Sequence, residues 1–166
     1  MENFEFYNPT KVIFRKGAET RVGAEIASRG FKKVLVHFGG TYLSETGVLD
    51  RIHESLKTAG IKYVDFGGVV PNPRLSHVKE GVALCRKENI DFILGVGGGS
   101  AIDSSKAIAY GLANDFDLKS MGKTPTTRIA PVGCIKPLRR QAQKQQFNSC
   151  DHRNKRPGHI EAFLQS

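Results

Sequence analysis

The sequence predicts an α/β fold with a mainly parallel sheet and flanking helices. Short apolar runs alternate along the chain with segments whose apolar residues recur at helical spacing. Two or three glycines follow each of three apolar runs, and the order of elements is strand, helix, strand, helix. This alternation is typical of a parallel sheet with right-handed crossover connections, which binds ligands at the carboxyl ends of its strands.

The predicted strands span residues 33–38, 61–66 and 92–96, which are rich in Val, Ile, Leu and Phe. The helix after the first of them has one apolar face, formed by Val48, Leu49, Ile52, Leu56 and Ala59. Gly60 ends this helix, because glycine readily takes the left-handed conformation of a helix C-terminus. The apolar stripe of the next helix consists of Leu75, Val78, Val82 and Cys85.

The most informative segment is the glycine run that follows the strand at residues 92–96. Gly97, Gly98 and Gly99 precede Ser100 and a predicted helix start. Glycines let a phosphate approach the backbone, and a helix N-terminus offers free N–H groups and a positive dipole end. A structural interpretation stands beside this one: a tight turn in which Ser100 and Asp103 form a capping pair. The run lacks the G-x-G-x-x-G fingerprint, so the surrounding pattern decides in favour of a nucleotide.

Length and composition indicate a single domain and an intracellular protein. The chain has 166 residues, which is near the common domain size. It contains no apolar run long enough to span a bilayer, and its first five residues are acidic rather than basic, so we expect a cytoplasmic protein. Cys85, Cys134 and Cys150 are widely spaced, which argues against a disulfide framework or a cysteine zinc site. We expect Cys85 in the core.

The net charge of +9 is concentrated in the last part of the chain. Residues 136–166 carry seven Lys and Arg against two acids, a net charge of +5, and are rich in Gln and Arg without periodicity. We therefore predict a domain over residues 1–135 and a basic tail over residues 136–166 that does not order by itself. Any binding of nucleic acid by this tail would be nonspecific and sensitive to salt.

Five segments, in this order, carry a resemblance to a known family: residues 6–14, 37–41, 67–73, the run 97–106 with Asp103 and Lys106, and 131–134. Residues 1 to about 135 thereby resemble the iron-containing, or group III metal-dependent, alcohol dehydrogenases, and within them the butanol dehydrogenase-like branch. The resemblance implies a Rossmann-like dinucleotide-binding domain, which is present, and a helical domain that holds Fe or Zn with one Asp and three His, which is absent. Members transfer a hydride between NADH or NADPH and a small alcohol or aldehyde, with the metal as Lewis acid.

The resemblance also implies a set of cofactor-binding residues. Those matching Gly97, Gly98, Gly99 and Ser100 hold the pyrophosphate, and Asp103 lies near the nicotinamide. The residues matching Gly39, Gly40 and Thr41 lie by the adenosine ribose, and Asn72 is a further cofactor residue. Because no acid stands at the end of the strand before Gly39 to bind a ribose 2′-hydroxyl, we expect NADP in preference to NAD.

The histidines do not reproduce the family's metal ligands. His37 ends a strand, and we expect His53 and His77 on solvent-facing sides of helices; His152 and His159 lie in the tail. We therefore assign no metal ligand and no catalytic residue.

Two functions of different classes follow, an active dehydrogenase and a noncatalytic NAD(P)-binding fragment. A basic nucleic-acid-binding module ranks last. The N-terminal strands would allow a homodimer, as edge strands in this family do.

The tail has a further interpretation as the product of a shifted reading frame. Residues 138–144 can be encoded by codons that, read from the third base, give Ala-Ala-Ala-Gly-Ser-Glu. The family continues after the segment at 131–134 into small residues and a similar turn that contacts the cofactor. One lost base near Lys136 would thus explain both the loss of the resemblance and the missing second domain.

Overall fold

The computed structural model of the chain describes residues 10–40, 42–114, 129–137 and 160–165. Its strands form one six-stranded sheet of order β3-β2-β4-β5-β6-β1, in which every recorded pairing is parallel. The strands are β1 (Val12–Phe14), β2 (Lys33–Phe38), β3 (Lys62–Phe66), β4 (Phe92–Val96), β5 (Val132–Pro137) and β6 (Ile160–Gln165). The helices are η1 (Ala18–Arg21), α1 (Val22–Ala27), α2 (Tyr42–Glu45), α3 (Val48–Thr58), α4 (Leu75–Glu88) and α5 (Gly99–Ala113). The predicted α/β class is confirmed.

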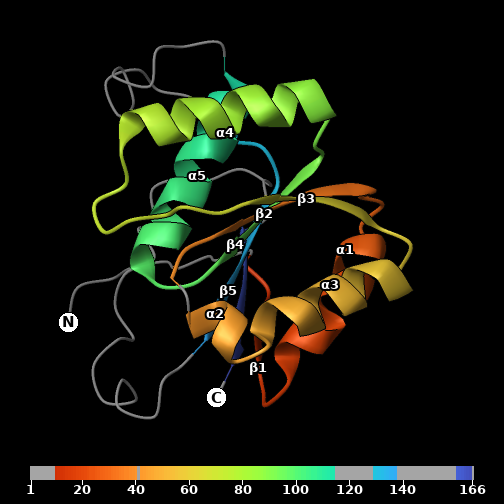
Figure 1. Ribbon diagram of the computed structural model, residues 1–166. Helices are drawn as coiled ribbons and strands as arrows, with labels where there is room; N and C mark the ends of the chain where they lie inside the picture. The colour runs from red at the N-terminus through yellow and green to blue at the C-terminus, as the bar shows by residue number, and fades with distance from the viewer. Residues whose placement is uncertain (1–9, 41, 115–128, 138–159, 166) are drawn as a thin grey trace, which may run out of the picture.

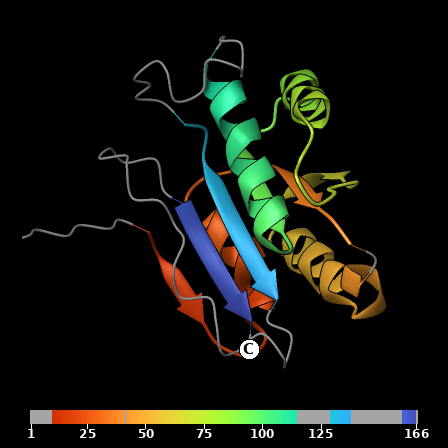
Figure 2. The same cartoon turned by 90° about the vertical axis from the view of Figure 1, so that its left-hand side faces the viewer.

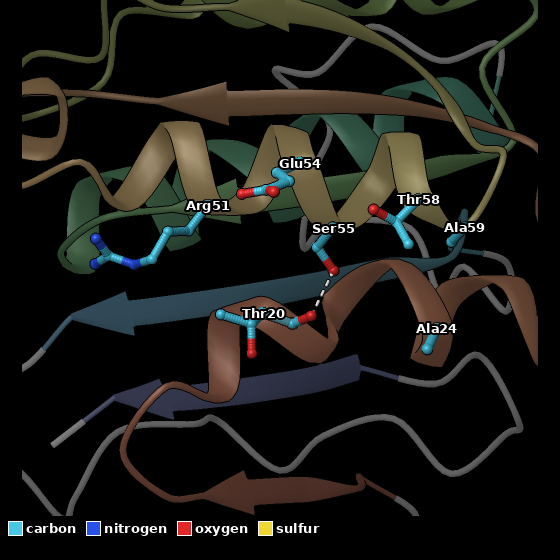
Figure 3. Close-up of a pocket in the computed structure, with 7 residues that line it drawn as sticks. All are labelled: Thr20, Ala24, Arg51, Glu54, Ser55, Thr58 and Ala59. Carbon is cyan, nitrogen blue, oxygen red and sulfur yellow. Dashed lines mark hydrogen bonds between the residues drawn. The ribbon is translucent and has the colours of Figure 1, made fainter.

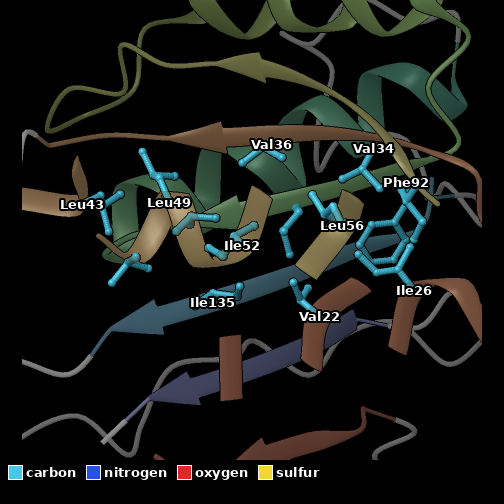
Figure 4. Close-up of a cluster of buried hydrophobic side chains, with 14 residues drawn as sticks. Val22, Ile26, Val34, Val36, Leu43, Leu49, Ile52, Leu56, Phe92 and Ile135 are labelled. Atoms are coloured by element: carbon cyan, nitrogen blue, oxygen red, sulfur yellow. The ribbon is translucent and has the colours of Figure 1, made fainter. Parts of the chain in front are cut away.

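Helices cover both faces of the sheet, as Figure 1 shows: α1, α2 and α3 lie on one face, and α4 and α5 on the other. Alternate residues of each strand enter different cores because side chains along a strand point to opposite faces. Val34 and Val36 of β2 pack with the first group of helices (Figure 4), whereas Leu35 packs with the second. The predicted helix stripes are the contact surfaces of these two cores.

Helix ends follow the residues that the sequence offers there. Gly60, with φ of +71°, follows α3, and the Ile61 N–H donates to the Leu56 carbonyl at 2.9 Å. Asn89 ends α4 in the same left-handed region. The predicted stripe of α4 is confirmed for Val78, Val82 and Cys85 but not for Leu75, which is 37% exposed. Leu75 is the first residue of α4, where the helix begins beyond its contacts with the sheet.

The end of the chain differs from the expectation of a boundary near residue 135. Strand β5 continues to Pro137, and residues 160–165, inside the predicted unstructured tail, form β6 between β1 and β5 (Figure 2). A neighbour on each side provides hydrogen-bond partners for both edges of β6, which an isolated segment lacks. The rest of the predicted tail, residues 138–159 and 166, lies outside the described residues.

The order of the strands creates a switch point between β2 and β4. From β2 the chain moves through α3 to β3 on one side, and from β4 it moves through α5 to β5 on the other. In open parallel sheets, ligands bind outside the carboxyl ends of the two strands at such a point, where the connections diverge. Here these ends carry the two predicted glycine turns, Gly39–Gly40 and Gly97–Gly99.

Candidate cofactor site

The two glycine turns lie against each other at the switch point. Gly97, the residue after β4, is buried and has φ of +142°, a conformation that favours glycine. A Cβ atom added to Gly97 would lie 3.1 Å from the Ala101 Cβ and 3.6 Å from the Gly39 carbonyl oxygen. The sequence segments 39–40 and 97–99, far apart along the chain, therefore form one site.

The start of α5 has the geometry of a phosphate cradle. Gly98 is the N-cap residue, and its carbonyl accepts from the N–H groups of Ala101 and Ile102 at 3.1 and 3.2 Å. The N–H groups of Gly99 and Ser100 precede these bonds and belong to the donors that a helix leaves free at its start. Gly98 and Gly99 are exposed, and a Cβ added to either meets nothing within 4 Å. The residues present fit an anionic group such as a pyrophosphate.

The alternative interpretation of this segment as a Ser100–Asp103 capping pair is wrong. The helix begins at Gly99, two residues earlier than a cap at Ser100 requires, and its N-cap residue is Gly98, which has no side chain to form a cap. Ser100 is half-buried and Asp103 is exposed on the first turns of α5. Both residues therefore lie near the N-terminal end of α5, which is at the switch point.

The other glycine turn, Gly39–Gly40, is in close contact with neighbouring protein atoms. A Cβ added to Gly39 would lie 2.5 Å from the Val69 Cβ and 2.6 Å from the Val69 carbonyl oxygen. Gly40 has φ of +90°, and a Cβ there would lie 3.0 Å from the Tyr42 ring. Thr41, the third residue expected here, lies outside the described residues. Asn72, exposed with φ of +57°, lies three residues beyond Val69 in the loop after β3.

His37 and Ser104 form a buried hydrogen bond beside the candidate site that sequence reasoning missed. His37 is the fifth residue of β2 and is 0% exposed; Ser104 on α5 is 1% exposed. His37 Nε2 lies 2.8 Å from Ser104 Oγ, and Nδ1 lies 2.8 Å from the Phe66 carbonyl oxygen. Burial lowers the pKa of His37 to about 4, although the bond to Phe66 opposes the shift. The signal in the sequence is a histidine directly after three apolar residues in the strand Lys33–Phe38.

The other two described histidines do not lie on free solvent faces, contrary to expectation. His53 stacks on Tyr63 with ring centroids 4.5 Å apart, and its Nε2 lies 2.9 Å from Asp65 Oδ1. His77 stacks on Phe66 at 4.4 Å. Both are half-buried because the helices that carry them pack over β3 and its neighbours. His152 and His159 lie outside the described residues.

A groove of about 340 Å³ lies elsewhere, between η1, α1 and α3 (Figure 3). Several of its polar groups already bond within the protein. Ser55 donates to the Thr20 carbonyl at 2.8 Å and accepts from the Gly23 N–H at 3.0 Å. Arg51 binds Glu19 at 2.8 Å. The groove is separate from the glycine turns and contains none of the predicted cofactor residues.

The described part of the chain brings no three His, Cys, Asp or Glu side chains together as metal ligands. The described residues therefore do not fit the divalent metal that the resemblance implies. Cys85 is buried as expected, and burial raises the pKa of its thiol to about 12. No helix within the described ranges is long and apolar enough to cross a membrane.

Comparison with known proteins identifies the family of the chain. The sequence pattern of the family described as iron-containing alcohol dehydrogenase matches residues 9–137. The NADH-dependent butanol dehydrogenase A of Clostridium acetobutylicum is 42% identical over 137 residues, which is 81% of this chain and 35% of that protein. The NADPH-dependent aldehyde reductase YqhD of Escherichia coli is 36% identical over 141 residues, with 81% and 35% covered.

A solved structure extends the likeness. The NADH-dependent butanol dehydrogenase A of Thermotoga maritima superimposes with a TM-score of 0.84 at 33% identity, covering 99% of this chain and 44% of that one. The curated relatives are much longer, since the chain spans about a third of their length. The family match, over residues 9–137, contains strands β1–β5 and both glycine turns of this chain.

Proposed function

Because the chain belongs to the iron-containing alcohol dehydrogenase family, we propose that it is the nicotinamide-cofactor-binding part of an alcohol dehydrogenase or aldehyde reductase. The relatives named above are butanol dehydrogenases and an aldehyde reductase that use NADH or NADPH. The substrate class proposed for the whole enzyme is therefore a small alcohol or aldehyde, which exchanges a hydride with the nicotinamide ring.

One observation carries the proposal: the open space over Gly98 and Gly99 at the start of α5. No atom of the described residues requires glycine at these two positions, since an added Cβ would meet none of them within 4 Å. A ligand that must approach the backbone closely explains the glycines. The helix N-terminus beside them favours a negatively charged group, and the pyrophosphate of a dinucleotide has that charge.

Within this site we propose a role for each predicted residue. Gly97, Gly98, Gly99 and Ser100 surround the pyrophosphate; Gly39, Gly40 and Thr41 lie by the adenosine ribose; Asp103 lies toward the nicotinamide, and Asn72 lies beside the cofactor. The preference for NADP over NAD is likewise a proposal. It is supported by the absence of an acid at the two positions directly after β2, where a carboxylate would bind the ribose 2′-hydroxyl.

The chain is proposed to bind the cofactor without turning over substrate. Hydride transfer in this family joins cofactor, substrate oxygen and a Lewis acid in one site. The described residues include the proposed cofactor site, but they contain no cluster of side chains that could hold a metal ion. A cytoplasmic location is part of the proposal. It is supported by Cys85 and Cys134, which form no disulfide among the described residues, and by the need for a nicotinamide cofactor.

Two further proposals concern the ends of the chain. The exposed side chains of Val12 and Phe14, 54% and 63% accessible on edge strand β1, support a homodimer formed through this edge. Sedimentation of the chain and of its Phe14→Lys variant tests the homodimer.

The end of the family match at residue 137 supports a shifted frame in the tail. The nucleotide sequence after codon 135 tests the frame shift, which requires a family-like continuation in another frame.

The central experiment is a titration of the purified 166-residue chain with NADPH and with NADH, followed by nicotinamide fluorescence. Butanal and Zn²⁺ or Fe²⁺ are added afterwards to measure turnover. The expected result is binding, tighter for NADPH, without turnover. Turnover would mean that the chain does hold a metal in a catalytic position, and absence of binding would refute the proposed cofactor site.

A further inference from the structure

We infer that His37 and Ser104 are positioning residues for the cofactor site, because their buried hydrogen bond holds the first turns of α5 against the carboxyl ends of β2 and β3. Neither residue is proposed to touch the cofactor. The inference rests on the proposed function, since the group being positioned is the phosphate cradle at the start of α5.

The hydrogen bond connects β2 and α5, the two elements that lead into and out of the glycine turns. His37 lies two residues before Gly39 on β2, and Ser104 lies four residues after Ser100 on α5. Residues four apart share a face of a helix, so Ser104 stands one turn below Ser100 on the side that faces the strand. The distance of 2.8 Å between His37 Nε2 and Ser104 Oγ therefore sets how far the cradle lies from the first turn.

The donors and acceptors of this bond are fixed by a third group. A carbonyl oxygen only accepts, so the Nδ1 atom of His37, 2.8 Å from the Phe66 carbonyl, must carry the proton. In the neutral ring Nε2 is then the acceptor, and the Ser104 hydroxyl donates to it. Phe66 is the last residue of β3, so one imidazole ties the ends of β2 and β3 to α5.

The surroundings of His37 favour the neutral ring that this arrangement requires. The ring is fully buried, with Phe66 stacked at 5.1 Å and His77 of α4 at 5.6 Å. Burial disfavours the charged imidazolium, and a positive charge on His77 would oppose it further. A buried hydrogen bond is costly to break because the group left without a partner cannot bind water. The link is thus a stable support under the site.

The next residue along α5 provides a matched control. Ser105 is also buried, but its hydroxyl donates to the Ala101 carbonyl of the same helix at 2.7 Å. Ser104→Ala and Ser105→Ala each remove one buried hydroxyl from neighbouring positions of α5. Only the first substitution breaks a bond from α5 to a strand. A difference between the two variants therefore measures the tether and not the loss of a buried oxygen.

Two measurements on the full 166-residue chain test the inference. The first is hydrogen exchange of the backbone amides of residues 97–103 without cofactor. We expect faster exchange in Ser104→Ala than in Ser105→Ala at equal thermal stability. The second is NADH titration, in which Ser104→Ala should raise the Kd about fivefold, as for the loss of one hydrogen bond, and Ser105→Ala less than about twofold.

Variants of the imidazole complete the test. His37→Gln should retain the wild-type Kd for NADH within about twofold, because the amide oxygen can accept from Ser104, whereas His37→Leu should raise it as Ser104→Ala does. Equal exchange over residues 97–103 in the two serine variants would overturn the inference, whatever the Kd values. If no form of the chain binds NADH, the proposed function fails, and this result is distinct from equal exchange.

Discussion

The two glycine turns at the switch point contain glycine for different physical reasons. Gly39 packs against the backbone of Val69, so an added Cβ would lie 2.6 Å from the Val69 carbonyl oxygen. Gly98 and Gly99, in the other turn, face open space. The fold itself requires the first glycine, whereas nothing in the fold requires the other two. The proposed ligand is therefore needed to explain only the glycines whose neighbouring space is free.

The largest expected effect is on the stability of the first turn. Gly39→Ala should lower the free energy of unfolding by about 3 kcal/mol, because the new Cβ must displace backbone atoms of Val69. Gly98→Ala should change it by less than about 0.5 kcal/mol, since Gly98 has φ of −81° and free space beside it. Urea unfolding of both variants measures the difference. Equal losses would contradict the contrast between the turns.

Acid should weaken the support that both turns share. The unfolded chain binds a proton on His37 near pH 6.5, whereas the folded chain, whose His37 pKa is lowered to about 4, does not. The unfolded state therefore gains stability as the pH falls below about 6.5. The free energy of unfolding should decrease by about 2 kcal/mol between about pH 6.5 and pH 5. His37→Gln, followed by urea unfolding at each pH, should remove most of this dependence.

The second turn should lose affinity without losing stability. Gly98→Val places a branched side chain in the open space and should raise the Kd for NADPH at least about tenfold. Its thermal midpoint should remain close to that of the wild type, since extended backbone accommodates valine. Fluorescence titration and thermal unfolding of the same sample test both statements. An unchanged Kd would remove the argument for a phosphate cradle.

The smallest effect concerns the exposed side chain beyond the cradle. Asp103→Ala should weaken NADPH binding about threefold, as expected for the loss of one solvent-accessible polar contact. His53→Ala is the control, because His53 stacks on Tyr63 and lies beside Asp65, away from the glycine turns. This control should bind NADPH as the wild type does. Equal weakening in both variants would exclude a specific role for Asp103.

Local patterns predicted most of the elements that carry the site. Strands 33–38 and 92–96 match β2 and β4 residue for residue, and Gly60 ends α3 as expected. These features depend on periodicity and on glycine, which act within a few residues of the chain. The placement of Gly97–Gly99 after β4 and before α5 follows from the same patterns.

Long-range contacts explain what the patterns missed. The pairing of β6 with β1 and β5 depends on neighbours that are distant in sequence. The half-buried positions of His53 and His77 likewise depend on stacking partners on β3. A helix-capping pattern at Ser100 and Asp103 was locally plausible, but the start of α5 at Gly99 displaced it.

The sequence by itself determined the α/β class, the strands at 33–38 and 92–96 and the positions of both glycine turns, because these depend on local spacing. The resemblance of its motifs indicated the family. Only the tertiary structure decided which glycines are open to solvent and which face Val69. It also decided that His37 is a buried neutral tether to Ser104 rather than a strand-end histidine. The physical reason is that free space, burial and hydrogen-bond partners are properties of atoms that the fold brings together from distant parts of the chain.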